Sequence, residues 1–211
     1  MNDDAPQPQH TSDLRTSDLL IELGQASDRP EMSVGELLDA LSDRAFGVAM
    51  LVLAIPVCIP FLYGVPQVLS LPMLLIALQM VLGRHTLWMP ERLRARTFSR
   101  AEFGKMAARA KRYLGWGEAI ARPRALFLTG NGPERLFGLF MSIFCISILV
   151  PLPLTNTTPG IAIAIMAIGM IERDGLLIVL GTVLGAFWVG MLVFAASTLL
   201  IWLGQLQGLF C

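Results

Sequence analysis

The polar side chains that could do chemistry in this chain lie at a few places that border or interrupt long apolar runs. Glu172, Arg173 and Asp174 form the most concentrated acidic group, with apolar residues on both sides. Such a group could ligate a cation or a phosphate headgroup at a membrane surface. It could equally form a plain cytoplasmic turn that caps the following helix. The sequence leaves both interpretations open.

Two arginines stand at equivalent places, because Arg44 and Arg135 each lie two residues before a Phe-Gly pair. A guanidinium matches a phosphate group in a fork geometry, so the two arginines could bind an anionic lipid. As positively charged anchors on the cytoplasmic side they would need no ligand. The first interpretation makes Arg44 and Arg135 candidate lipid contacts, and the sequence leaves both interpretations open.

The most polar stretch inside an apolar run is Thr155-Asn156-Thr157-Thr158, and its counterpart in the first run is Gln67 with Ser70 nearby. Polar groups at membrane depth are costly, and they usually face a cavity or one another. A turn at the far membrane surface would explain the same residues without a ligand. Gln67 and Asn156 are therefore candidate substrate contacts.

Nothing in the sequence is typical of an enzyme: it contains no Ser/His/Asp set, no paired catalytic carboxylates and no Gly-rich phosphate loop. The only histidines are His10 and His85, and no Cys/His spacing suits a metal. We predict no catalytic residues, no metal and no cofactor. All three cysteines lie in apolar runs and are interpreted as small core residues: Cys58, Cys145 and Cys211.

The elements that must position these residues are three long runs without Asp, Glu, Lys or Arg, namely 45–83, 136–171 and 175–211. About 20 apolar residues cross a bilayer core of about 30 Å. The chain is 55% hydrophobic and only 15% charged, whereas globular proteins are about 25% charged. We predict an all-α polytopic membrane protein.

The net charge is zero, but residues 1–44 carry −7 and residues 84–124 carry +8. Because positively charged loops stay in the cytoplasm, we expect the N-terminus, residues 84–134 and residues 172–174 on that side of a bacterial inner membrane. No basic segment precedes an apolar one at the N-terminus, so no signal peptide is expected.

Prolines break the first two runs into hairpins. The unbroken arms of the first run, Phe46–Ile59 and Leu69–Gly83, would reach only about 22 Å, which is short of the bilayer core. We therefore predict re-entrant or barely spanning hairpins. Six prolines are the expected structural breaks: Pro56, Pro60, Pro66, Pro151, Pro153 and Pro159.

The second run repeats the first at an offset of about 91 residues, since Arg44-Ala-Phe-Gly recurs as Arg135-Leu-Phe-Gly and Pro60 aligns with Pro151. Tandem broken segments are typical of transporter folds, whose breaks meet near the membrane midplane. Chance similarity between two Leu-rich and Ile-rich stretches is the alternative.

Three further elements complete the expected architecture. Ser33 and Glu36 match a capping box, which predicts a helix that runs on to Arg44. Residues 90–116 predict a basic amphipathic helix on the membrane surface. Residues 176–203 predict one spanning helix, in which Gly181 and Gly185 permit close packing. The expected domains are a disordered acidic N-terminus (1–30), two hairpin repeats (31–89 and 131–174), the basic segment (90–130) and the C-terminal helix (175–211).

The order of several short motifs carries a family resemblance. A capped "SVGELLDALSDRAFG" opening, "LGRHTLWMPERL", "ERLFG", "VPLPLTNTTPG" and "ERDGLL" follow one another over residues 30–205. This order resembles the ExoD family of bacterial exopolysaccharide-synthesis membrane proteins. The resemblance implies an inner-membrane protein associated with envelope polysaccharide production.

The expected function is a non-enzymatic membrane role in exopolysaccharide synthesis that handles a lipid-linked or anionic lipid substrate. A small-solute or ion transporter and an adaptor of a polysaccharide synthase complex are the alternatives. The expected partners are membrane lipids (anionic ones above all), polysaccharide-synthesis proteins and a second copy of the chain. No nucleic acid is expected.

Overall fold

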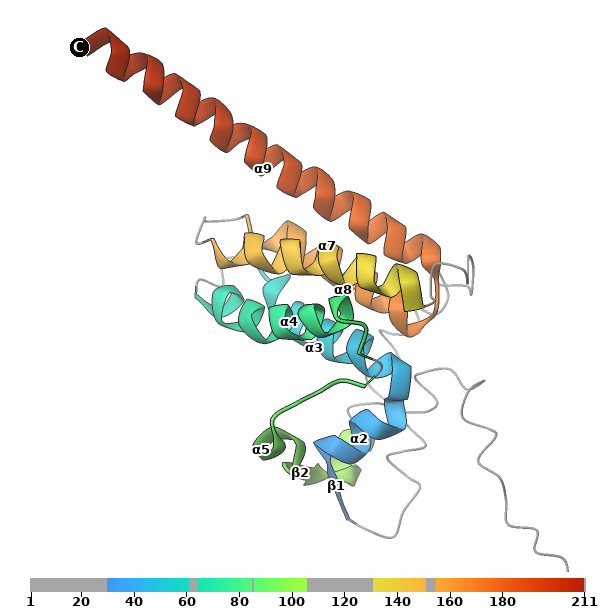
Figure 1. The fold of residues 1–211 in the computed structure, drawn as a ribbon. Coiled ribbons are helices and arrows are strands. Elements are labelled where there is room, and N and C mark those ends of the chain that lie inside the picture. Colours follow the sequence, from blue (N-terminus) through green and yellow to red (C-terminus); the bar gives the residue numbers. More distant parts are fainter. Residues whose placement is uncertain (1–29, 61–63, 85, 106–130, 151–154, 211) are drawn as a thin grey trace, which may run out of the picture. The chain divides into compact units, whose positions relative to one another are not determined.

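The computed structural model describes residues 30–60, 64–84, 86–105, 131–150 and 155–210 (Figure 1). The chain divides into two compact units, which comprise residues 1–42 with 89–122 and residues 43–88 with 123–211. The expected disordered N-terminus, most of the basic segment, Pro151 and Pro153 lie outside the described residues.

The first unit is built around a capped helix. Strand β1 (Glu31–Ser33) leads into helix α2 (Val34–Leu41). The Ser33 hydroxyl accepts a hydrogen bond from the Glu36 amide, and the Glu36 carboxylate accepts one from the Ser33 amide, both at 3.1 Å. The predicted capping box is therefore confirmed. The helix does not continue to Arg44, because Ser42 adopts a positive φ of 47° and a short 3₁₀ turn, η1 (Ser42–Arg44), follows.

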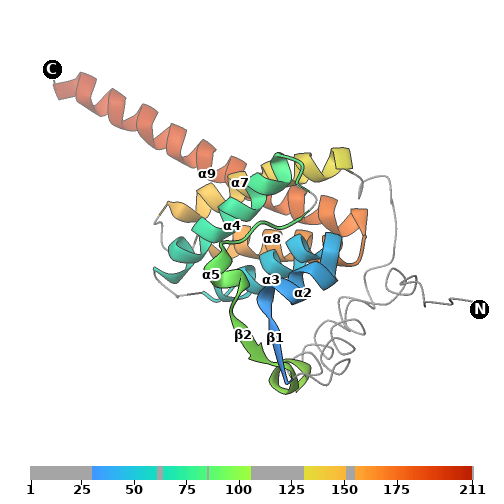
Figure 2. The same ribbon diagram turned by 60° about the horizontal axis from the view of Figure 1, so that its bottom comes forward.

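The prediction of one basic helix over residues 90–116 is wrong in its described part. Helix α5 (Glu91–Arg94) has a single turn, and strand β2 (Thr97–Ser99) then pairs antiparallel with β1 (Figure 2). The pairing brings Phe98 opposite Met32, whose side chain is buried. A partner 66 residues away in the sequence thus overrides the local helical pattern.

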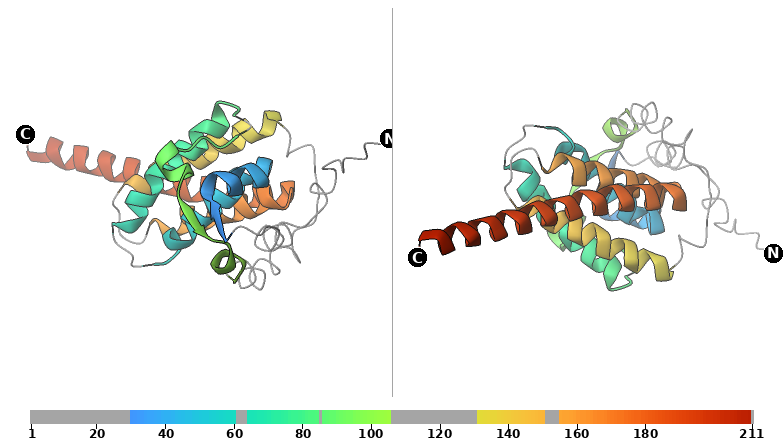
Figure 3. Two further views of the ribbon diagram at one scale, coloured as in Figure 1. Left: turned by 90° about the horizontal axis from the view of Figure 1, so that it is seen from below. Right: turned by 90° about the horizontal axis from the view of Figure 1, so that it is seen from above.

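The second unit contains a bundle of four helices: α3 (Ala45–Val57), α4 (Val65–Val81), α7 (Asn131–Leu149) and α8 (Thr157–Ile171). Figures 1 and 3 show these helices side by side. The closest neighbours belong to different hairpins, because α4 packs along α7 and α3 packs along α8. The core between them is rich in methionine and alanine, including Met50, Met73, Met141 and Met166.

The prolines act differently from the prediction. Pro56 lies inside α3 and does not end it, although the helix stops one residue later. Pro66 and Pro159 lie in the first turns of α4 and α8, where a missing backbone donor costs nothing. As a result α4 begins at Val65, four residues before the expected start of the second arm. Pro60 alone of the described breaks lies in a turn.

Helix α9 (Gly175–Phe210) crosses the bundle and extends past it (Figure 1). Its first half packs on α8 and α7, whereas the large apolar side chains of its second half are exposed, including Phe194, Leu200 and Trp202. Two helices are long and apolar enough to cross a membrane among the described residues: α7 over Gly132–Leu149 and α9 over Gly175–Trp202. The helices α3 and α4 are shorter, as predicted for the arms of the first hairpin, and α8 is shorter as well.

Candidate functional site

The charged turn between α8 and α9 is organised by Asp174. This residue is only 2% exposed, and its carboxylate accepts the backbone amides of Leu176 at 2.9 Å and Leu177 at 3.4 Å. These are the second and third residues of α9, so Asp174 is the N-cap of that helix. Asp174 thus has the role that the turn interpretation assigns to it.

The same turn closes α8 with a left-handed residue. Arg173 has a φ of 53°, its amide donates to the Met170 carbonyl, and the Asp174 amide donates to the Gly169 carbonyl at 2.8 Å. This pair of bonds is a Schellman motif, which normally uses glycine at the left-handed position. Arginine at that position carries a backbone cost of about 1–2 kcal/mol.

Arg44 lies beside this turn at the start of α3. Its guanidinium is half-buried, and burial lowers the pKa of Arg44 from its ordinary value. The positive charge of Arg173 lowers the pKa of Arg44 further, whereas the Glu172 carboxylate raises it. The three residues therefore form one electrostatic group at the end of α8.

Arg135 lies at the end of α4 in the corresponding way. A Cβ atom built on Gly83 would lie 2.5 Å from Nη2 and 2.6 Å from Nε of Arg135. Gly83 has a φ of 70° and follows α4 in another Schellman motif. The Gly83 amide donates a hydrogen bond to the Met80 carbonyl, and the Arg84 amide donates one to the Gln79 carbonyl. A guanidinium placed over the C-terminus of a helix interacts favourably with its carbonyls.

The two predicted apical residues lie in different settings. Gln67 is in the first turn of α4, and its side-chain oxygen is buried with no hydrogen-bond partner among the described residues. Asn156 is the N-cap residue of α8. Its backbone carbonyl accepts a hydrogen bond from the Gly160 amide at 3.1 Å, and its side chain makes no capping hydrogen bond. The polar cavity that Gln67 and Asn156 are expected to share stays a prediction.

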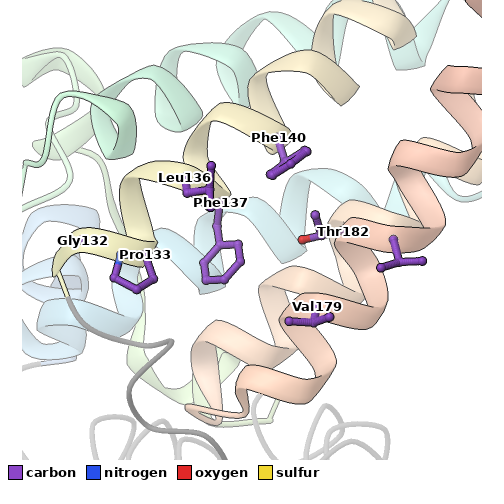
Figure 4. Close-up of a pocket in the computed structure, with 8 residues that line it drawn as sticks. Gly132, Pro133, Leu136, Phe137, Phe140, Val179 and Thr182 are labelled. Atoms are coloured by element: carbon purple, nitrogen blue, oxygen red, sulfur yellow. The ribbon is translucent and has the colours of Figure 1, made fainter.

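The packing glycines Gly181 and Gly185 are both buried. A Cβ atom at Gly181 would lie 2.7 Å from the Ala162 carbonyl of α8, and one at Gly185 would meet the Phe144 ring of α7. Closer to the start of both helices than the contact of Gly185 with Phe144, α7 and α9 leave an open groove of about 480 Å³ between them. Figure 4 shows its lining, which comprises Gly132, Pro133, Leu136, Phe137, Phe140, Val179, Thr182 and Val183.

Sequence reasoning missed this groove. Its α7 wall has the helical spacing Pro133, Leu136, Phe137 and Phe140, which marks one face of a helix. That spacing does not reveal which other helix the face meets, because α9 is apolar on every side.

Comparison with known proteins places the chain in a family. Residues 16–194 match the family described as "Exopolysaccharide synthesis, ExoD", and this match includes the whole bundle, both arginines and the groove. The chain belongs to the ExoD family. Membership links it to exopolysaccharide synthesis.

Two curated proteins are similar to the chain, and the first of them supports this assignment by its name. Protein ExoD of Rhizobium meliloti (strain 1021) is 30% identical over 152 residues, which is 70% of this chain and 63% of that protein. An uncharacterized protein of Synechocystis sp., slr1875, is 28% identical over 150 residues, which is 70% of this chain and 71% of that protein. No solved structure matches the chain.

Proposed function

We propose that this ExoD-family protein is embedded in the inner membrane, where it binds a lipid substrate of exopolysaccharide synthesis without doing covalent chemistry on it. Family membership supports the process, and the long apolar helices α7 and α9 support the location, with α9 as the helix that we propose to span the bilayer. A transporter of small solutes or an adaptor of a synthase complex is the alternative.

A hydrogen bond near the middle of α9 carries the proposed membrane arrangement. The Trp188 indole donates to the Thr155 carbonyl at 3.1 Å, next to the N-cap of α8. Within the apolar span Gly175–Trp202, Trp188 has 13 residues before it and 14 after it. If α9 spans the bilayer, the second hairpin turns back near the membrane centre and is therefore re-entrant.

The exposed second half of α9 is consistent with this arrangement. Met191, Val193 and Phe194 are more than 40% exposed, and apolar side chains continue to Trp202. A row of exposed apolar side chains along half a helix is unfavourable in water but ordinary in lipid. At the hairpin apex, in contrast, backbone groups need partners because no water is present, and the Trp188 indole supplies one of them.

We also propose that the two hairpins are tandem repeats that interlock. A Cβ atom at Gly47 would lie 3.1 Å from the Ala167 carbonyl, and one at Gly138 would lie 3.0 Å from the Ala77 carbonyl. The glycines are 91 residues apart and the alanines 90 residues apart. Each hairpin thus offers a glycine to the equivalent position of the other, and this correspondence supports a repeat over chance similarity.

The depth of Trp188 is the decisive measurement. A variant in which Trp88, Trp116 and Trp202 are phenylalanine leaves Trp188 as the single fluorophore, since the chain has four tryptophans. In vesicles of brominated phospholipids, we expect the strongest quenching from bromines near the acyl-chain ends. A matched variant that keeps only Trp202 should be quenched best by bromines near the headgroups.

Two results would overturn parts of the proposal. Quenching of Trp188 by headgroup-proximal bromines would place the apex at the far surface and make the hairpins fully spanning.

Reporter fusions after Glu91, Glu118 and Asp174 should all give cytoplasmic signals, and a periplasmic signal after Asp174 would contradict the paired hairpins.

A further inference from the structure

We propose that the groove between α7 and α9 is a binding site for one acyl chain of a membrane phospholipid. This inference rests on the proposed membrane location and names the lipid that the proposed function leaves open. The volume of about 480 Å³ lies within the range of about 300–1,000 Å³ that is typical of small-molecule sites.

The chemistry of the lining admits hydrocarbon and little else. Its only hydroxyl belongs to Thr182, and this hydroxyl donates to the Ile178 carbonyl at 2.8 Å. The other lining side chains carry no polar group. A sugar or a polar peptide placed here would lose its hydrogen bonds to water without replacement, at a cost of about 1–3 kcal/mol for each group.

The groove opens toward the surface that would face lipid. Leu136 on α7 and Val183 on α9 are 52% and 60% exposed, whereas Phe137 between them is 5% exposed. Figure 4 shows the Phe137 ring pointing from α7 toward α9. The exposed rim continues along α9 to Phe187, which is 71% exposed. An acyl chain can therefore enter sideways from the bilayer without passing through water.

The length of the groove selects an acyl chain over a long polyprenyl chain. From Gly132 to Phe140 the α7 wall is about 12 Å long at 1.5 Å per residue. One leaflet of the bilayer core is about 15 Å thick, which is the depth that an acyl chain covers. The contact of Gly185 with Phe144 closes the inner end, so a much longer chain would have to leave the groove.

The headgroup end follows from the direction of the helices. Both α7 and α9 begin at the open end, where Gly132 and Pro133 precede the charged Glu134 and Arg135. The N-terminus of α9 is already capped by Asp174, whereas that of α7 favours negative charge, so a lipid phosphate is better placed at this end than at the closed one.

The test combines lipid retention with two pairs of matched variants. Val183→Phe and Leu136→Trp fill the groove from either wall. Val193→Phe and Leu139→Trp add the same bulk at positions that are 63% and 48% exposed on the same two helices and do not line it. We expect purified protein to keep one phospholipid per chain in native mass spectrometry. The groove variants should bind it about tenfold more weakly, and the control variants should match the original protein.

A photoreactive lipid maps the site. Phosphatidylglycerol that carries a diazirine near the end of one acyl chain should label the peptides around Phe144 and Gly185. Excess phosphatidylglycerol should abolish this label, whereas polyprenyl phosphate should not. Labelling spread evenly along residues 191–202, or displacement by polyprenyl phosphate at lower concentration, would overturn the proposal. Conversion of a dimer to a monomer by Val183→Phe alone would instead identify a second copy of the chain as the occupant.

Carbonate extraction separates this proposal from the one on which it rests. Protein that stays in the membrane pellet but retains no lipid in the groove would sink the acyl-chain site only. Protein that carbonate releases would sink the membrane location itself. Thermal unfolding of all four variants shows whether a loss of lipid reflects a loss of fold, and the Leu136→Trp variant decides if Val183→Phe does not fold.

Discussion

The two helix pairs of the bundle, α3 with α8 and α4 with α7, share one design and differ at their charged ends. In each pair a glycine near the start of one helix, α3 or α7, meets an alanine carbonyl of the other helix, α8 or α4. That other helix ends in a Schellman motif beside an arginine. The left-handed residue of that motif is Gly83 in one pair and Arg173 in the other, 90 residues later.

This difference shows that the ends of α4 and α8 are stabilised in different ways. At Gly83 the Arg135 guanidinium lies where a side chain would stand, and the φ of 70° also favours glycine. At the other end Arg173 adds a positive charge beside Arg44, and the chain passes directly into α9 through Asp174. The second pair thus has a tightly packed end, whereas the first has a charged junction with the long helix.

The largest effect should come from the packing glycines. Gly47→Leu and Gly138→Leu should each lower the free energy of unfolding in detergent by about 1–3 kcal/mol or prevent folding, because the added atoms meet backbone atoms as well as a side chain of the neighbouring helix. Gly190→Leu is the control, since nothing lies within 4 Å of its Cβ position. If only one of the two packing variants is unstable, the helix pairs are not equivalent.

An intermediate effect should come from the left-handed residues, with opposite signs in the two pairs. Gly83→Ala should destabilise the protein by about 1–2 kcal/mol through its positive φ alone. The total should be larger, because the added methyl group meets the Arg135 guanidinium. Arg173→Gly should stabilise it by up to about 1 kcal/mol, since glycine relieves the positive φ. Urea or thermal unfolding in detergent measures both changes. A destabilised Arg173→Gly variant would assign Arg173 a structural contact that outweighs its backbone cost.

The smallest effect concerns Arg135 itself. Arg135→Ala should cost about 0.3–1 kcal/mol through the loss of a cation at the C-terminus of α4. Combined with Gly83→Ala it should cost less than the sum of the two, because the steric part of the Gly83 effect disappears with the guanidinium. Additive effects in this double-mutant cycle would mean that Arg135 moves aside freely and does not hold the end of α4.

Sequence alone determined the features that depend on neighbouring residues. The Ser33–Glu36 cap and the short arms of the first hairpin follow from local hydrogen bonding and hydropathy, and the structure contains them. The long C-terminal helix follows in the same way, and it runs from Gly175 to Phe210, beyond the expected 176–203. The order of short motifs also identified the ExoD family.

Tertiary structure alone decided which helices meet. Because α3, α4, α8 and α9 are apolar on nearly every side, hydropathy does not select their contact faces, and small residues such as Gly138 and Gly181 select them by allowing close approach. The pairing of β1 with β2 likewise depends on a partner far along the chain. The groove arises for the same reason: α7 and α9 touch where Gly185 admits the Phe144 ring, and they separate where neither helix offers a glycine to the other.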